Sequence, residues 1–354
     1  MTVEPPPPPA AGDPADRPAE VVVTGAAGWL GQNLVRALVG SRARVRCLVH
    51  RPEDGALLEV LGPAVEVVVG DLRDPVALDR LFAGVGPATV LHAASVIHPG
   101  GRVRELFDVN VGGTENVLDR ARRASATRFL HVSSNSPFGA NDGPTDRFTE
   151  DSPPNPYLGY GRSKLEAEQL VQRSHDRGDL ATVILRPPWF YGPHQPARQS
   201  QFFTAIRKGR FPLVGDGTQQ RSMVFTGNLV DALLAAEVAP CAPGQAYWVA
   251  DAEPYELREI IATVRRALEA EGFAVAGRGP RIPARAAAVA AAADAALQGA
   301  GRYVQPLHVL GELRDTIACD IGKARRELGW EPATELFGGM RASIRWCVER
   351  GVAL

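Results

Sequence analysis

The sequence has few lysines and cysteines and no excess of either charge. Only three of its 39 basic residues are lysines, at positions 164, 208 and 323, so arginine fills nearly every basic position. A formal net charge of -1 argues against a strongly basic surface, and we expect no nucleic-acid partner. The four cysteines are far apart in the sequence and match no metal-ligand spacing. We therefore expect no metal site and a reducing, cytoplasmic location.

Long hydrophobic runs are also missing. Residues 284–301 are rich in alanine, but Arg285 and Asp294 interrupt them, and the uncharged part is too short to span a bilayer. The first 19 residues contain a run of five prolines and no apolar core of a secretory signal. The sequence therefore predicts no transmembrane segment, and a disordered, proline-rich tail at residues 1–19.

Short apolar stretches alternate with amphipathic segments from residue 20 onward. Strands are expected at 21–24, 45–49, 65–69, 89–93, 128–133 and 181–185. This order predicts an α/β fold, a Rossmann-type doubly wound parallel sheet with a smaller, mostly C-terminal substrate-binding part. We place the NAD(P)-binding domain at 20–190 and the mainly substrate-binding part at 191–354, with a strand and helix at about 226–250 returning to the first domain.

A glycine-rich turn follows the first expected strand and opens a helix. Gly25 permits the tight turn, Gly28 lets backbone N–H groups approach a pyrophosphate, and Gly31 allows the helix to pack closely on the sheet. This context favours dinucleotide binding over a purely structural turn. Asp71 ends the third strand, where its carboxylate could accept a hydrogen bond from an adenine amino group or, alternatively, from nearby backbone N–H groups.

The end of the second strand bears on the choice of nicotinamide cofactor. An NAD enzyme usually has a carboxylate there, which holds the ribose 2′-hydroxyl. This sequence instead has Val49, His50 and Arg51, and Arg51 could pair with a 2′-phosphate. We therefore predict NADP as the preferred cofactor, with NAD possible; the alternative interpretation of Arg51 is an ordinary surface charge.

Tyr160 and Lys164 lie four residues apart on an expected helix, and therefore on one face of it. A nearby ammonium group and an oxidised nicotinamide both favour the phenolate, so Lys164 and the bound cofactor together would lower the pKa of Tyr160 and let it exchange a proton near neutral pH. Lys164 could also hydrogen-bond the nicotinamide ribose. The fifth strand ends in hydroxyl residues, among them Ser134, that could bind the substrate oxygen.

Together these motifs make the chain resemble an extended short-chain dehydrogenase/reductase of the NAD-dependent epimerase/dehydratase type. Further motifs that carry the resemblance are Gly70-Asp71-Leu72, His92-Ala93-Ala94, Asn110-Val111-Gly112, Tyr191-Gly192-Pro193 and Leu328-Gly329-Trp330. The resemblance makes Tyr160 the acid/base, Lys164 its partner and Ser134 the catalytic hydroxyl. It also implies cofactor contacts by Trp29, Leu30, Asp71, Leu72, Ala93, Ala94, Asn110 and Pro187.

Two branches of this family compete for the substrate. The late segments resemble 3β-hydroxysteroid and sterol dehydrogenase-like enzymes, which implies one secondary alcohol or ketone on a largely apolar small molecule. The alternative is a nucleotide-sugar epimerase or 4-ketoreductase, in which Arg221 would hold a diphosphate. Candidate substrate contacts are Ser95, Asn135, Ser136, Trp189 and Arg221. A non-enzymatic redox sensor is a remote third alternative, because sensors on this fold typically lack the tyrosine or the lysine, and this chain has both Tyr160 and Lys164. The resemblance also implies a homodimer.

Overall fold

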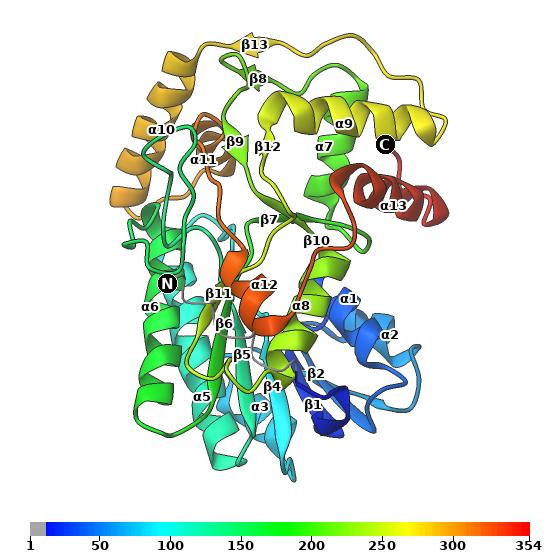
Figure 1. Ribbon diagram of the computed structural model, residues 1–354, viewed down its shortest axis with the longest axis vertical. Helices are drawn as coiled ribbons and strands as arrows, with labels where there is room; N and C mark the ends of the chain where they lie inside the picture. Colours follow the sequence, from blue (N-terminus) through cyan, green and yellow to red (C-terminus); the bar gives the residue numbers. More distant parts are fainter. Residues whose placement is uncertain (1–11) are drawn as a thin grey trace, which may run out of the picture.

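The computed structural model describes residues 12–354, and a seven-stranded sheet forms its centre (Figure 1). All strand pairs in this sheet are parallel, and the strand order is β11-β6-β5-β4-β1-β2-β3. The strands are β1 (Glu20–Thr24), β2 (Arg44–Val49), β3 (Val65–Val69), β4 (Ala88–His92), β5 (Arg128–Val132), β6 (Thr182–Arg186) and β11 (Ala246–Trp248). The predicted Rossmann-type α/β fold is confirmed. Because the order reverses between β1 and β4, the crevice at their carboxyl ends is where such folds bind ligands.

Helices cover both faces of this sheet and bury apolar side chains against it. On one face lie α1 (Trp29–Leu38), α2 (Pro52–Glu59), α8 (Thr226–Val238) and α12 (Gly322–Leu328); on the other lie α3 (Pro75–Phe82), α5 (Gly113–Arg123) and α6 (Leu158–Asp176). Leu34 and Leu38 of α1, four residues apart, are fully buried, as an amphipathic helix requires. Each such leucine contributes roughly 1.5–3 kcal/mol through burial.

The helix that the sequence predicts from residue 104 to 123 contains an irregular turn. It begins as α4 (Arg104–Phe107), passes through a π-helical turn at Asp108–Gly112, and continues as α5. Such turns are often found at functional sites. Here the turn contains Asn110, whose side chain is buried and contacts the loop after β4.

The C-terminal half builds a second, smaller layer above the carboxyl ends of the strands (Figure 1). Helices α7 (Ala197–Arg207), α9 (Leu257–Ala270) and α13 (Leu336–Glu349) share one core with β7 (Trp189–Tyr191) and β10 (Met223–Phe225). The remaining elements are the strands β8 (Leu213–Val214), β9 (Gln220–Arg221), β12 (Tyr255–Glu256) and β13 (Arg281–Ile282), and the adjacent helices α10 (Ala284–Gly299) and α11 (Gln305–Glu312). In the chain, α8 and β11 lie between β10 and β12, and they return to the large sheet, where β11 pairs with β6.

The expected disordered tail is wrong for residues 12–19; residues 1–11 lie outside the described part of the chain. Pro14–Asp16 form a 3₁₀ turn, and the guanidinium of Arg17 donates to the backbone oxygen of Leu234, 3.2 Å away. Arg17 also lies 3.6 Å from Glu237 of α8, which pairs with Arg42 at 2.5 Å in a buried position. The proline-rich composition hid these contacts because they are made with residues more than 200 positions away. None of the helices in residues 12–354 has the length and apolarity needed to cross a membrane.

Candidate active site

The glycine turn brings the backbone of β1 against the end of β4. Gly25 has φ +68°, and a Cβ there would lie 2.7 Å from the backbone of Ala94. At Gly31 a Cβ would lie 2.0 Å from the carbonyl oxygen of Gly25, so any side chain would push α1 off the turn. No side chain caps α1, which leaves its first N–H groups free for an anion at the β1–β4 crevice. These residues fit the pyrophosphate of a dinucleotide.

Trp29 and Leu30, which follow the glycines, are buried at 9% and 5% exposure. The indole Nε1 of Trp29 donates to the backbone oxygens of Gly192 (3.2 Å) and Pro193 (2.9 Å), and its ring packs on Phe190. Their side chains therefore fix the start of α1 against the loop after β7, so a contact with pyrophosphate would come from their backbone N–H groups.

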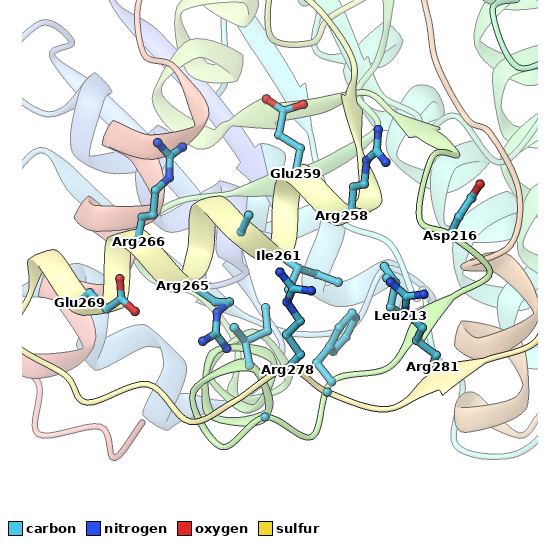
Figure 2. A pocket seen from close by; sticks show the side chains of 15 residues that line it. Leu213, Asp216, Arg258, Glu259, Ile261, Arg265, Arg266, Glu269, Arg278 and Arg281 are labelled. Carbon is cyan, nitrogen blue, oxygen red and sulfur yellow. The ribbon is translucent and has the colours of Figure 1, made fainter.

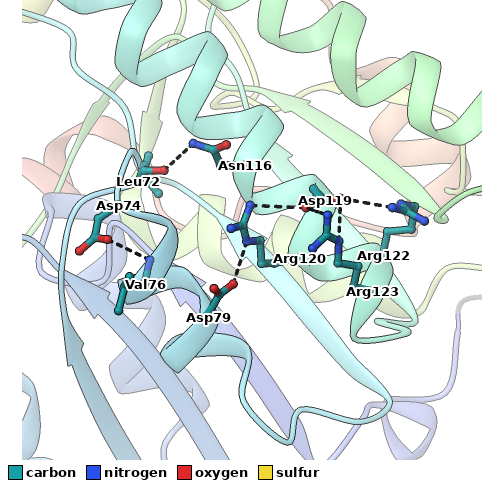
Figure 3. A network of polar contacts seen from close by, with 9 residues as sticks. All are labelled: Leu72, Asp74, Val76, Asp79, Asn116, Asp119, Arg120, Arg122 and Arg123. Atoms are coloured by element: carbon teal, nitrogen blue, oxygen red, sulfur yellow. Dashed lines mark hydrogen bonds and ion pairs between the residues drawn. The ribbon is translucent and has the colours of Figure 1, made fainter.

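The turn after β3, at the expected adenine end, is held in place by several hydrogen bonds. The carboxylate of Asp71 accepts from the backbone N–H of Arg73 at 2.8 Å and from its guanidinium at 2.7 Å and 2.8 Å. This pairing with Arg73 lowers the pKa of Asp71, which is therefore ionised at neutral pH. Asn116 of α5 donates to the backbone oxygen of Leu72 at 3.0 Å (Figure 3). The structure thus shows the local backbone pairing of Asp71 that the sequence left as its alternative role.

Arg51 stands directly after β2 and before α2, with its side chain 61% exposed. Its Nε and Nη2 each lie 3.1 Å from a carboxylate oxygen of Asp54. An exposed pair of this kind contributes little to stability, so the guanidinium is available to exchange partners. The neighbouring His50 is exposed and lies 3.7 Å from Asp71.

Asn110 connects the loop after β4 to α6. Its Oδ1 accepts from the backbone N–H of Val96 at 2.8 Å and from the hydroxyl of Ser95 at 3.1 Å. Its Nδ2 donates to the backbone oxygen of Val96 at 2.9 Å and to the hydroxyl of Ser163 at 3.0 Å. The resemblance implied cofactor contact by Asn110, but its amide, which is 1% exposed, is engaged within the protein. Ala93 and Ala94, which precede Ser95, are half-buried at the crevice.

Lys164 is 1% exposed and lies beneath the crevice. Its Nζ donates to the backbone oxygen of Val132 at 2.8 Å and lies 3.2 Å from Nε2 of His131. Burial lowers the pKa of Lys164 to about 8, and burial together with the charge of Lys164 lowers the pKa of His131 well below its usual value. His131 is therefore neutral and can accept from the ammonium group.

Tyr160 lies on the same helix, 9% exposed, and the structure brings it together with Ser134 and Ser95. Burial raises the pKa of Tyr160, whereas hydrogen bonding with Ser134 and Ser95 and the charge of Arg198 act in the opposite direction. The sequence predicted a lowered pKa caused by Lys164. In the protein alone the pKa of Tyr160 is raised instead, because burial of the phenol outweighs the opposing groups, and the ammonium group of Lys164 donates to Val132.

The hydroxyl groups at the end of β5 form a small hydrogen-bonded group. The Oγ of Ser134 lies 3.2 Å from Oγ of Ser136, accepts from the backbone N–H of Ser136 at 3.2 Å, and lies 3.4 Å from Oδ1 of Asn135. Ser134 therefore has a fixed position beside Tyr160, with hydrogen-bonding capacity left for a substrate oxygen.

Of the other predicted substrate contacts, Trp189 is half-buried and packs at a tilt against Phe202, with ring centroids 5.3 Å apart. Pro187 is buried between β6 and β7. Arg221 is only 5% exposed, and its guanidinium donates to the backbone oxygen of Glu312 and lies 3.4 Å from the Glu312 carboxylate. The Arg221 side chain is therefore already bound to α11, and it does not face an open diphosphate site.

A polar network between α10–α11 and α6 was not predicted from the sequence. The side-chain oxygen of Gln298 accepts from the backbone N–H of Gly159, one residue before Tyr160, at 3.1 Å. Its amide nitrogen lies 3.1 Å from both oxygens of Asp294, which also accepts from Nδ1 of His308 at 2.8 Å. The signal in the sequence was a polar pair, Asp294 and Gln298, four residues apart in an alanine-rich helix.

A second connection joins the same helices to the loop after β4. The hydroxyl of Tyr303, between α10 and α11, lies 2.6 Å from Nδ1 of His98. Burial and the charge of Arg198 lower the pKa of His98 to about 4, so His98 is neutral near pH 7. The α10–α11 pair is therefore attached to both segments that carry Ser95 and Tyr160.

Residues 21–250 match the model of the NAD dependent epimerase/dehydratase family. The chain is 34% identical over 313 residues to the 4-hydroxy-2-methyl-3-oxo-4-farnesyl-3,4-dihydroquinoline-1-oxide ketoreductase of Stigmatella aurantiaca, covering 87% of this chain and 90% of that protein. It is 31% identical over 338 residues to a 3 beta-hydroxysteroid dehydrogenase/Delta 5-->4-isomerase of Mycobacterium tuberculosis, covering 88% and 86%.

Among solved structures, the fold is similar to that of DesIV, a dTDP-glucose 4,6-dehydratase from Streptomyces venezuelae with NAD and TYD bound. The TM-score is 0.73 at 24% identity, and the match covers 94% of this chain and 98% of that chain. With its sheet, its glycine turn and these relatives, the chain belongs to the NAD dependent epimerase/dehydratase family and is an enzyme of the extended short-chain dehydrogenase/reductase type.

Proposed function

We propose that this enzyme transfers hydride between a nicotinamide nucleotide and a secondary alcohol or ketone on a largely apolar substrate. Tyr160 acts as the acid/base in this reaction. The proposal depends most on one observation, the burial of Arg221 against Glu312 of α11. A nucleotide-sugar enzyme would need that guanidinium for a diphosphate, and freeing it would break both the hydrogen bond to the Glu312 backbone oxygen and a partly buried ion pair.

The names of the two relatives reported above that are 34% and 31% identical to this chain point in the same direction. The protein from Stigmatella is named as a ketoreductase of a farnesyl-bearing quinoline oxide, and the mycobacterial protein as a hydroxysteroid dehydrogenase/isomerase. Both names describe redox chemistry at an oxygen of a large, mostly apolar molecule. The half-buried Trp189 and Phe202 next to it supply an apolar wall on this chain.

The reduction of a ketone requires a hydride, which the nicotinamide nucleotide supplies when bound, and a proton at the carbonyl oxygen. Tyr160 donates that proton, and in the oxidation direction it removes the proton of the alcohol. Ser134 donates a hydrogen bond to the same oxygen and stabilises the charge that develops there. Nζ of Lys164 donates to one backbone oxygen, that of Val132, and lies beside the His131 side chain; it would hold the nicotinamide ribose once it releases Val132.

NADP is the cofactor we propose for this chain. Support comes from the absence of a carboxylate in Val49, His50 and Arg51, and from the exposed guanidinium of Arg51. A 2′-phosphate can replace Asp54 as the partner of Arg51 and form charge-assisted hydrogen bonds with it.

The proposal is tested with purified enzyme and a panel of apolar ketones and nucleotide 4-keto-sugars, by following the loss of NADPH absorbance. We expect consumption with apolar ketones only; consumption with the sugars only would refute the substrate assignment. Tyr160→Phe removes the hydroxyl and should reduce turnover by at least about a hundredfold, the usual contribution of a general acid. Binding of NADPH, measured by fluorescence, should stay nearly unchanged.

A further inference from the structure

A cavity lies in the C-terminal layer, between α9, the end of α7 and the β8–β13 strand pair (Figure 2). Its volume is about 630 Å³, within the range of about 300–1,000 Å³ typical of small-molecule sites. None of the residues that line it is among those assigned above to cofactor, substrate or catalysis. The cavity, which we call the α9–β13 cavity, is therefore separate from the reaction site.

The floor of the α9–β13 cavity is apolar. It is formed by Ile206, Phe211, Leu213 and Ile261, which belong to the two hydrophobic clusters of this layer, and the exposed Ala262 lies at its edge. Ile206 is 2% exposed, so this side of the floor is part of the folded core. An apolar floor of this kind favours a hydrocarbon group over a bare ion.

The rim of the cavity is dominated by arginine. Five arginines line it, against three carboxylates (Asp216, Glu259 and Glu269), so its formal charge is +2 in a chain whose net charge is -1; the arginines are Arg258, Arg265, Arg266, Arg278 and Arg281. Arg258 forms an ion pair with Glu256. Within residues 12–354, none of the other four has a carboxylate within ion-pair distance.

The rim arginines come from two walls that face each other. Arg258, Ala262 and Arg265 follow one face of α9 at helical spacing. Arg278 and Arg281 come from the segment at β13, and Figure 2 shows Arg278 extending from that segment toward α9.

The second wall is held in place by backbone contacts. A Cβ at Gly279 would lie 2.0 Å from the backbone oxygen of Phe211, and the backbone N–H of Leu213 donates to Pro280 at 2.9 Å. The cavity is thus formed before any ligand arrives, which lowers the entropic cost of binding.

We propose that the α9–β13 cavity binds an anionic amphiphile, a molecule with a single hydrocarbon chain and a terminal carboxylate or phosphate. The chain lies on the apolar floor, and the anionic group pairs with Arg278 and Arg281. Guanidinium groups suit both anions because they can donate two parallel hydrogen bonds to either one. This site is independent of the proposed reaction, so it stands or falls separately from the substrate assignment.

The ligand would also affect the layer that covers the active site. The strands β8 and β13 carry Val214 and Ile282, which pack with Ala287 of α10 and with Leu313, the residue directly after α11. Because binding to the folded state stabilises it by mass action, an occupied cavity should raise the melting temperature of the protein.

The test measures displacement of 11-(dansylamino)undecanoic acid from the full-length enzyme by oleate, oleyl alcohol and inorganic phosphate. We expect saturable binding of oleate with a raised melting temperature, and much weaker displacement by the alcohol and by phosphate. Equal displacement by the alcohol would show a purely apolar groove, and equal displacement by phosphate a bare anion site; either would overturn the proposal. Binding to anionic vesicles without binding of monomeric oleate would overturn it as well.

Two variants alter the site, and a third serves as the control. The double substitution Arg278→Glu with Arg281→Glu should weaken oleate binding by about tenfold or more, the effect of losing one charged hydrogen bond. Ala262→Trp, at an exposed position of α9, should fill the floor and have a similar effect with all five arginines retained. The matched control is Arg122→Glu on α5, whose side chain is 48% exposed and outside the cavity. Equal binding by all variants would refute the site.

Discussion

Lys164 gives the sharpest prediction, because it is a buried cation with a lowered pKa. Burial lowers that pKa to about 8 from the ordinary 10.5. Between these two values the unfolded chain binds more protons than the folded protein does. Stability contributed by this residue is therefore lowest below pH 8 and rises with pH, until it is fully recovered above about 10.5.

The size of the effect follows from the same two values. The cost of burying the charge is about 3 kcal/mol at pH 7 and about 1 kcal/mol at pH 9.5, so about 2 kcal/mol is recovered between them. In Lys164→Met, a side chain of similar length without the charge, this recovery is absent. The free energy of unfolding of the wild type, relative to the variant, should therefore rise by about 2 kcal/mol from pH 7 to pH 9.5.

The assay is urea unfolding, followed by circular dichroism, of both proteins at the two pH values. Groups that titrate equally in both proteins cancel in the comparison. Lys208→Met, at an exposed lysine, controls for the loss of one positive charge. A difference between wild type and Lys164→Met that does not change with pH would refute the burial argument.

Three other predictions concern positioning and specificity. Gln298→Ala leaves the N–H of Gly159 without a partner and the carboxylate of Asp294 with His308 alone, so it should destabilise the protein by about 1–3 kcal/mol and lower kcat more than it raises KM; unchanged melting and kinetics would contradict this role. Arg51→Ala should lower kcat/KM for NADPH by about tenfold and leave that for NADH unchanged, and equal effects on both would remove Arg51 from cofactor choice. Glu312→Ala removes the carboxylate beside Arg221 but keeps the backbone oxygen to which the guanidinium donates. Arg221 should therefore stay bound there, and calorimetry should detect no binding of UDP or dTDP to the variant; clear binding would favour the nucleotide-sugar assignment.

The sheet could be predicted from the sequence because its signals are local. Each central strand is a short apolar stretch, and the glycines at 25 and 31 are required by contacts within the same βα unit. Tyr160 and Lys164 were recognisable for a similar reason, since their spacing on a helix is fixed by the sequence alone. Helix α7 was missed because the proline- and glycine-rich residues before it conceal its buried positions, which include Phe203 and Ile206.

The availability of charged side chains could not be predicted in this way. Arg221 fits a diphosphate by its position in the sequence, but its actual partner, Glu312, lies 91 residues further on. The pKa of Tyr160 likewise depends on burial and on Arg198, which only the folded chain brings near it. Local patterns identify which residue types are present, whereas the packing of distant helices decides which of them remain free.

The α10–α11 pair explains why substrate choice and catalytic geometry should change together in this enzyme. Glu312, which occupies Arg221, is on α11, and Gln298, which holds the N–H of Gly159, is on α10. The two helices pack against each other, and the His308–Asp294 hydrogen bond joins them. A movement of α11 large enough to admit a diphosphate would therefore strain the contact that positions the first turn of α6, and with it Tyr160. We therefore expect a change of substrate class to need coordinated substitutions in both helices, because a single change at Glu312 leaves Arg221 bound to a backbone oxygen.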